Sequence, residues 1–196
     1  MTPPLPPVPT SPVGLRRAVF LDRDGVLNQT RVIDGKPYPP RTVEEFILLP
    51  GVSEACRRLK EAGFLLVVAT NQPDVGRGTL PQETVETIHE HLRRVLPIDR
   101  VEASYASGGE EPPSELRKPR PGMLLRAARD LGIDLTRSFM VGDRWRDIDC
   151  GHAAGCTTLL VDYGYDETLR LPPHYRVNNL LEAADIILGL EPKRPD

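Results

Sequence analysis

Short apolar runs alternate with segments of helical periodicity along most of this chain, and this alternation constrains the fold more than any other feature. The runs lie at 18–21, 64–69, 101–106, 138–141 and 157–161, and each is nearly continuous in apolar residues. Strands with apolar side chains on both faces are typical of a parallel sheet that helices cover on both sides. The sequence therefore predicts an α/β fold, a Rossmann-like doubly wound parallel sheet in three layers.

The segments between these runs carry the helical pattern. Val52, Ala55, Cys56 and Leu59 recur at spacings of three and four residues, and this segment ends at Gly63. The same period predicts helices over about 81–96, 124–131, 145–154 and 179–188. No internal repeat is present, so one domain is expected for the 196 residues.

The two ends of the chain differ from this pattern. Residues 1–14 read MTPPLPPVPTSPVG, and so many prolines prevent a helix or a paired strand. We expect residues 1–14 to be a disordered tail, residues 15–190 to be the folded domain, and residues 191–196 to be a C-terminal tail. A ligand for an SH3-like partner is a second interpretation of the proline-rich segment.

Composition excludes several classes of protein. The net charge of −3 argues against binding to nucleic acid or to an anionic membrane. Cys56, Cys150 and Cys156 lack the paired spacing of a disulfide framework or a thiolate zinc cluster, which favours a reducing compartment. No apolar stretch is long enough to span a membrane, and no secretion signal is visible. We therefore expect a cytoplasmic monomer whose partner is a small molecule.

Polar residues follow several of the predicted strands. Asp22 and Asp24 come directly after the first strand, Thr70 and Asn71 end the second, and Asp143 with Asp147 follows the fourth. Lys118 precedes the third helix, after a long connection from Ser107 to Pro121; a second long connection runs from Asn28 to Pro50. Ligands of open α/β sheets bind beyond the carboxyl ends of the strands, so we expect these groups to form one site.

These residues resemble the four motifs of the haloacid dehalogenase-like hydrolase superfamily, in order DRDG, the threonine of TNQ, the lysine of RKP, and GDRWRD. More narrowly, DRDGVLN, ATNQPDVGRG, RKPRPGM and VGDRWRDID are similar to the heptose bisphosphate and histidinol phosphate phosphatase branch. The resemblance covers about Arg16 to Leu188. It implies a phosphatase domain without a separate cap domain, because no stretch between the motifs is long enough to fold as one.

The resemblance also implies a mechanism. Asp22 would attack phosphorus and carry the phosphoryl group, and Asp24 would protonate the leaving group and then activate water. Mg²⁺ would be held by Asp22, the backbone carbonyl of Asp24 and Asp143, with Asp147 orienting Lys118 or a metal-bound water. The groups expected to bind the phosphate or the rest of the substrate are Thr70, Asn71, Lys118, Arg77, Arg117 and Asn28.

One feature of the branch is missing. Many members hold a structural zinc through a Cys-x-His pair and a Cys-x-Cys pair ahead of the motif lysine. The corresponding positions here read Tyr105-Ala106-Ser107 and Ser114-Glu115-Leu116, so no zinc is expected. Pro112 and Pro113 are candidates for ordering this loop instead.

The substrate remains the most open question at the level of sequence. The resemblance favours a sugar bisphosphate of carbohydrate metabolism such as D-glycero-D-manno-heptose 1,7-bisphosphate, since Arg77 and Arg117 could grip a second phosphate. Histidinol phosphate or another small phosphorylated metabolite is the alternative. A catalytically silent phosphosugar-binding module is a further possibility, although such a protein would not need Asp24.

Overall fold

A six-stranded, entirely parallel sheet forms the centre of the protein in the computed structural model, which describes residues 14–33, 36–109 and 112–190. Of the tails expected at 1–14 and 191–196, residues 1–13 and 191–196 lie outside the described part of the chain, and Gly14 is exposed. The strand order is β5-β4-β1-β6-β7-β8. The strands are β1 (Ala18–Leu21), β4 (Leu65–Asn71), β5 (Arg100–Ser104), β6 (Phe139–Gly142), β7 (Thr157–Val161) and β8 (Tyr175–Val177).

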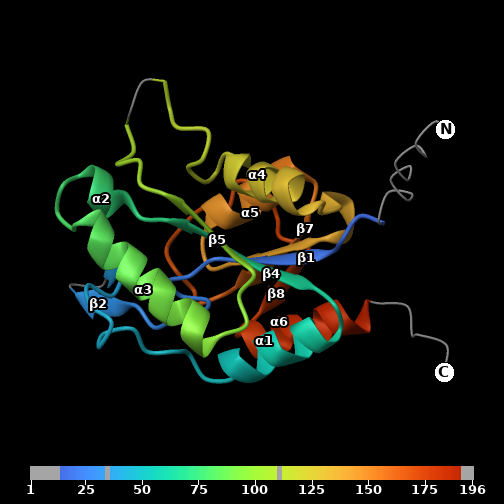
Figure 1. Ribbon diagram of the computed structural model, residues 1–196. Helices are drawn as coiled ribbons and strands as arrows, with labels where there is room; N and C mark the ends of the chain where they lie inside the picture. Colours follow the sequence, from blue (N-terminus) through green and yellow to red (C-terminus); the bar gives the residue numbers. More distant parts are fainter. Residues whose placement is uncertain (1–13, 34–35, 110–111, 191–196) are drawn as a thin grey trace, which may run out of the picture.

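Helices cover both faces of this sheet (Figure 1). One layer contains α4 (Gly122–Leu131) and α5 (Trp145–Ala154), and the other contains α1 (Val52–Glu61), α3 (Gln82–Val95) and α6 (Leu180–Gly189). The predicted three-layer α/β fold is therefore confirmed. The structure adds β8 at the sheet edge, the short helix α2 (Pro73–Gly76), a 3-10 turn at Leu135–Arg137, and an antiparallel pair formed by β2 (Arg31–Ile33) and β3 (Lys36–Tyr38).

The two cores follow from the alternation of side chains along each strand. In β1, Val19 and Leu21 face the core that contains α1, α3 and α6, whereas Ala18 and Phe20 face the core that contains α4 and α5. All four side chains are fully buried, because helices cover both faces of the sheet at β1, while β4 and β6 cover its two edges. This double burial explains why the strand sequences are apolar throughout rather than alternating.

The fold brings the expected functional segments to one edge. Because β1, β4 and β6 run parallel and adjacent, the residues after Leu21, around Thr70 and after Gly142 all leave the sheet at its carboxyl edge. The loop between β5 and α4 crosses the same edge (Figure 1). Among the residues that the structure describes between the motifs, at 25–33, 36–109 and 112–142, none form a separate cap domain.

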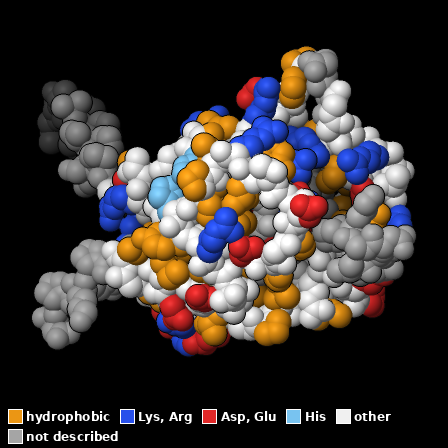
Figure 2. All heavy atoms as spheres, turned by 180° about the vertical axis from the view of Figure 1, so that it is seen from behind, with side chains coloured by type: hydrophobic (Ala, Val, Ile, Leu, Met, Phe, Trp, Pro, Cys, Tyr) orange, Lys and Arg blue, Asp and Glu red, His pale blue; other side chains and the backbone are white. Residues whose placement is uncertain are grey.

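The surface carries charges of both signs. Figure 2 shows Lys and Arg side chains gathered along the upper part of the face seen from behind, with Asp and Glu side chains also present over it. Among the described helices, none combines the length and the apolar content needed to cross a lipid bilayer.

Helix α5 lies unusually close to the sheet at Gly151. A Cβ at this position would meet Thr158 Cγ2 at 2.6 Å and Met140 Cβ at 2.8 Å. The missing side chain therefore allows α5, which begins beside the site, to sit directly on β6 and β7.

We expect Gly151→Ala to destabilise the fold by about 1–3 kcal/mol, because the added methyl group overpacks this contact. The thermal midpoint should fall by about 2–4 °C for each kcal/mol. Gly189→Ala in α6 is the matched control, since a Cβ there meets nothing within 4 Å; it should be neutral or stabilise by up to about 1 kcal/mol. Equal midpoints for the two variants would contradict the close approach of α5.

Candidate active site

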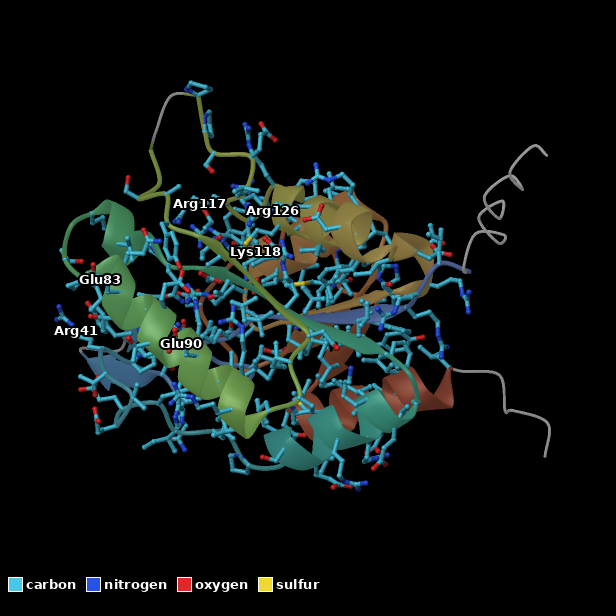
Figure 3. The ribbon with its side chains drawn as sticks, in the orientation of Figure 1. Arg41, Glu83, Glu90, Arg117, Lys118 and Arg126 are labelled. Carbon is cyan, nitrogen blue, oxygen red and sulfur yellow. The ribbon has the colours of Figure 1, made fainter. Side chains whose placement is uncertain are left out.

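A cavity of about 270 Å³ opens at the carboxyl edge of the sheet and contains most of the expected site residues. Asp22 continues from β1, and its backbone N–H donates to the Val141 carbonyl of β6 at 2.9 Å. The residues that line the cavity are Asp22, Asp24, Thr30, Tyr38, Pro39, Thr70, Asn71, Pro73, Asp74, Arg77, Arg117, Lys118, Asp143, Arg144, Arg146 and Asp147. In Figure 3, Lys118 lies where the loop before α4 meets the sheet, with Arg117 further out.

Lys118 holds two acidic residues together. Its ammonium group is 2.9 Å from Asp22 Oδ1 and 2.5 Å from Asp147 Oδ1, and it also donates to the Ala69 carbonyl at 2.8 Å. Burial alone would lower the pKa of this side chain, which is only 2% exposed, but the charges of Asp147 and Asp22 outweigh burial and raise the pKa above its usual value. Lys118 is therefore a permanent cation at the base of the cavity.

Asn71 fixes the backbone around this lysine. Its side-chain amide donates to the Lys118 carbonyl at 3.0 Å, and its side-chain oxygen accepts from the Lys118 N–H at 3.0 Å. The end of β4 is thereby tied to the loop before α4. The sequence placed Asn71 near the phosphate, and the structure shows that its side chain is committed to positioning Lys118.

Two glycines leave room for the carboxylates. A Cβ at Gly142 would lie 2.1 Å from Asp147 Cβ, and a Cβ at Gly25 would lie 2.3 Å from Asp143 Oδ2. Gly25 also has a φ of 88°, which side-chain-bearing residues rarely adopt. Glycine is therefore required at position 142 for the approach of Asp147. It is required at position 25 for the approach of Asp143 and for the turn after β1.

Three carboxylates converge beside Lys118. One oxygen each of Asp22, Asp143 and Asp147 lies within 4.8 Å of the others. Burial, reinforced by Asp147 and Asp24, raises the pKa of Asp22 to about 6 although Lys118 opposes the shift. Burial and the charge of Asp22 raise the pKa of Asp143 well above its usual value. The three groups repel one another, and a cation among them would relieve that repulsion.

The donor set suits a hard divalent cation. Asp143 Oδ1 is buried without a hydrogen-bond partner among the described residues, so it is available as a ligand. Asp147 differs, because Oδ1 contacts Lys118 and Oδ2 accepts from the Arg144 N–H at 3.0 Å. Carboxylate oxygens are the ligands that Mg²⁺ prefers. Asp22 and Asp143 are thus the side chains that could hold the metal, while Asp147 orients its neighbours.

Asp24 is held by residues behind the cavity. Arg23, which is fully buried, donates to Oδ2 at 2.9 Å and to Oδ1 at 3.2 Å and 3.1 Å. Asn28 donates to Oδ1 at 3.0 Å and Gln72 to Oδ2 at 2.8 Å. Burial alone would raise the pKa of Asp24, but the charge of Arg23 and these hydrogen bonds hold the pKa below its usual value. Asp24 is therefore ionised in the resting protein.

Thr70 is oriented by the same network. Gln72 Nε2 donates to Thr70 Oγ1 at 2.9 Å as well as to Asp24. Because the hydroxyl already accepts a hydrogen bond, its own proton points elsewhere and can be donated within the cavity. Asn28, expected at the substrate, instead lies buried behind Asp24, where its amide also donates to the Gln29 carbonyl.

The two expected arginines both line the cavity but have contacts of their own. Arg77 is about half-exposed and pairs with Asp74 at 3.4 Å. Arg117 donates to the Ala106 carbonyl at 2.7 Å, and Arg120 donates to the Pro113 carbonyl at 3.1 Å. The guanidinium groups of Arg117 and Arg120 therefore cross-link the loop around Lys118.

Sequence reasoning missed several residues of the site. Arg23 and Gln72 position Asp24, and Arg144 and Arg146 line the cavity from the start of α5. Both arginines stand inside the motif GDRWRD. Arg144 is the N-cap of α5 and Arg146 lies in its first turn, and this place at the start of a helix at the carboxyl edge is the signal that could have identified them. Sequence reasoning also missed that the segment after β7 contacts the site. Its Tyr163 hydroxyl donates to the Gly25 carbonyl at 2.9 Å, in the turn that follows Asp24.

Comparison with known proteins places these features in context. Residues 115–183 match a family model described as HAD-hydrolase-like. The chain is 39% identical over 171 residues to D-glycero-D-manno-heptose-1,7-bisphosphate 7-phosphatase of Thermosynechococcus vestitus, covering 78% of this chain and 82% of that protein. It is 37% identical over 156 residues to D-glycero-alpha-D-manno-heptose-1,7-bisphosphate 7-phosphatase of Burkholderia mallei, covering 74% and 79%.

A solved structure agrees over most of the chain. The crystal structure of D,D-heptose 1,7-bisphosphate phosphatase from B. bronchiseptica, complexed with magnesium and phosphate, matches with a TM-score of 0.76 and 31% sequence identity. The match covers 88% of this chain and 98% of that one.

The raised pKa values of Asp22 and Asp143 predict how a metal affects stability. Above about pH 4 these two carboxyls bind more protons in the folded protein than in the unfolded chain, so their contribution to the stability of the metal-free protein should fall as pH rises from about 4 through about 6. Mg²⁺ binds the ionised carboxylates and should therefore raise the thermal midpoint more at about pH 7.5 than at about pH 5.

Asp143→Asn tests this directly by thermal melts with EDTA and with Mg²⁺. In EDTA at about pH 7.5, the variant should melt a few degrees higher than the wild type, because one repelling carboxylate is gone, and Mg²⁺ should add little. The control is Asp185→Asn. Asp185 is exposed on α6 and pairs with Arg58 of α1, outside the cavity, so this variant should keep the wild-type response to Mg²⁺. A full Mg²⁺ response in Asp143→Asn would contradict the assignment.

Proposed function

The chain belongs to the haloacid dehalogenase-like hydrolase superfamily, in which it is a phosphatase, and from this premise we propose that it hydrolyses a sugar bisphosphate through a phosphoryl group carried on Asp22. The substrate that we propose is D-glycero-D-manno-heptose 1,7-bisphosphate. The observation that carries the mechanism is the cluster of Asp22, Asp143 and Asp147 around the buried ammonium group of Lys118.

Asp22 is the nucleophile of the proposed reaction. Its carboxylate lies at the floor of the cavity, at the end of the central strand. In the first step a carboxylate oxygen bonds to phosphorus while the bond between phosphorus and the sugar oxygen breaks. In the second step a water oxygen attacks the same phosphorus, the bond to Asp22 breaks, and inorganic phosphate leaves. The carboxylate is thereby regenerated.

Asp22 and Asp143, with the backbone carbonyl of Asp24, would hold Mg²⁺. The orphaned Asp143 oxygen and the raised pKa values support this assignment. The metal supplies positive charge that offsets the repulsion between the carboxylates and an arriving phosphate. Lys118 contributes a second positive charge, and the Thr70 hydroxyl a hydrogen bond, to the non-bridging oxygens of the phosphoryl group.

Asp24 is the general acid and base of the proposal. It donates a proton to the departing sugar oxygen and later accepts one from the attacking water. In the resting protein Arg23 keeps it ionised. A phosphate dianion beside it adds negative charge, which raises the pKa of Asp24 and favours the protonated form. Arg23, Asn28 and Gln72 hold the carboxyl in place while its proton is gained and lost.

The proposed substrate rests on two lines of support. The relatives described above carry the name heptose bisphosphate phosphatase at 37–39% identity over about three quarters of this chain. In addition, the cavity is small and four arginines, Arg77, Arg117, Arg144 and Arg146, line it, which favours an anionic group beyond the scissile phosphate. A cationic amine such as that of histidinol phosphate would be repelled there.

Asp22→Asn should lower turnover by at least about a thousandfold, because it removes the nucleophile and a metal ligand together. Folding should be retained, since the change also removes a repelled buried carboxylate. Steady-state rates with Mg²⁺, alongside a thermal melt, measure both effects. Asp162→Asn, a carboxylate at the sheet's edge paired with Arg176, is the control. A variant that keeps more than a few per cent of wild-type turnover would rule out a phosphoryl group on Asp22.

The wild-type protein should show its highest kcat/KM with D-glycero-D-manno-heptose 1,7-bisphosphate in a side-by-side panel. The panel should also include a hexose bisphosphate, histidinol phosphate and nucleoside monophosphates. We expect a preference of about tenfold or more over the monophosphates, as one charge-assisted contact to a second phosphate provides. A preference for histidinol phosphate would refute the substrate but leave the phosphatase chemistry intact.

A further inference from the structure

Five cationic side chains line the cavity, and they differ in whether protein groups already engage them. Lys118 pairs with Asp22 and Asp147. Arg144 pairs with Glu167 through two hydrogen bonds, one of them 2.8 Å long. Arg77 pairs with Asp74, and Arg117 donates to the Ala106 carbonyl. A ligand that binds any of these four must compete with a protein acceptor.

Arg146 is the exception. Its guanidinium group lines the cavity but forms no hydrogen bond or ion pair with the residues at 14–33, 36–109 and 112–190. The contact that holds it is a stack on Trp145, with the guanidinium carbon 4.6 Å from the ring centroid. Stacking uses the face of the guanidinium plane, and the N–H donors at its edge stay available to an acceptor.

Neighbouring groups favour an anion at this position. The nearby Glu167 would compete for Arg146, but Arg144 holds that carboxylate through two hydrogen bonds. These bonds are the main cause of the lowered pKa of Glu167, and the charge of Arg146 adds to it from a distance. Arg146 lies in the first turn of α5, one residue before Asp147, so helix geometry ties it to the same scaffold that fixes Lys118. The guanidinium is thus half-buried and stacked on an aromatic ring, and within the described structure its charge acts on Glu167 only at a distance, without a hydrogen bond or ion pair.

We propose that Arg146 binds the second, non-scissile phosphate of the substrate and is the residue that selects a sugar bisphosphate over a monophosphate. The inference rests on the proposed function, because it requires that a sugar bisphosphate enters this cavity. A phosphate accepts two parallel hydrogen bonds from a guanidinium edge, which gives orientation as well as affinity. Arg146 would then hold the far end of the substrate while Asp22 and Lys118 engage the phosphate that is removed.

The test compares two substrates that share the scissile phosphate: D-glycero-D-manno-heptose 1,7-bisphosphate and D-glycero-D-manno-heptose 7-phosphate. For Arg146→Ala, kcat/KM should fall about 10- to 100-fold more for the bisphosphate than for the 7-phosphate, mainly through KM. Arg146→Lys keeps the charge but not the planar fork, so its ratio should lie between those of the wild type and the alanine variant.

Arg170→Ala is the matched control. Arg170 stacks on the same Trp145 ring at 3.9 Å, but it is not among the residues that line the cavity. Its removal disturbs the same aromatic contact, and the ratio of the two substrates should stay at the wild-type value. A change in the ratio for Arg170→Ala as large as that for Arg146→Ala would show that packing on Trp145, and not a contact to phosphate, sets the preference.

Two further outcomes would overturn the assignment of Arg146. These are an equal loss of kcat/KM on both substrates and an unchanged ratio in Arg146→Ala. If the wild-type protein hydrolyses no phosphomonoester, the proposed function fails, and calorimetric titration of the two heptose phosphates still decides the inference. Tighter binding of the bisphosphate that disappears in Arg146→Ala supports it, and equal binding by both proteins refutes it.

Discussion

The whole site depends on one buried ammonium group. Lys118 sits between Asp22 and Asp147 with almost no exposure to solvent, and an unpaired charge at that depth would be strongly unfavourable. The dependence is mutual, because three carboxylates within 4.8 Å of one another would also repel without it. Asn71 fixes the lysine backbone and Gly142 gives Asp147 room, so strands β4 and β6 are both arranged around this contact. The parallel sheet places Asp22 and Asp147 at one edge, and the ion pairs with Lys118 hold them together there.

The two aspartates of the first motif have opposite electrostatic environments. Asp22 shares its surroundings with other carboxylates, and its pKa is raised to about 6, whereas Arg23 holds the pKa of Asp24 below its usual value. In the proposed reaction these tendencies must be reversed, since the nucleophile acts as an anion and the acid must carry a proton. A cation beside Asp22 and Asp143 and a phosphate dianion beside Asp24 shift both groups in the required directions. In the proposed reaction the two aspartates therefore reach their reactive protonation states only when both the cation and the phosphate have bound.

Much of this arrangement could be predicted from the sequence, and the failures have physical causes. The central strands were found because burial on both faces demands continuous apolar residues, and Asp22, Lys118 and Asp143 because the carboxyl edge of a parallel sheet collects polar residues. Strand β8 was missed because Tyr175–Val177 is three residues long and has an exposed centre at the sheet edge. Arg23 is fully buried, and nothing in the spacing of a charged residue between two aspartates reveals that it packs behind them. Among the described residues, Arg146 has no hydrogen-bonded carboxylate because Glu167, more than twenty residues away in the sequence, is bonded to Arg144. Such competition for partners is a property of tertiary packing.

The cross-links in the loop before Lys118 affect how the protein responds to its chemical surroundings. Arg117 donates to the Ala106 carbonyl and Arg120 to the Pro113 carbonyl, in or beside the positions that correspond to the Cys-x-His and Cys-x-Cys pairs of the branch pattern. Guanidinium groups are neither oxidised by peroxides nor stripped by chelators that take up soft metals. The wall of the cavity should therefore keep its shape under thiol-oxidising conditions and when zinc is scarce. For the proposed Mg²⁺ site, loss of activity on adding a chelator would then report on Asp22 and Asp143, because arginine side chains hold the neighbouring loop.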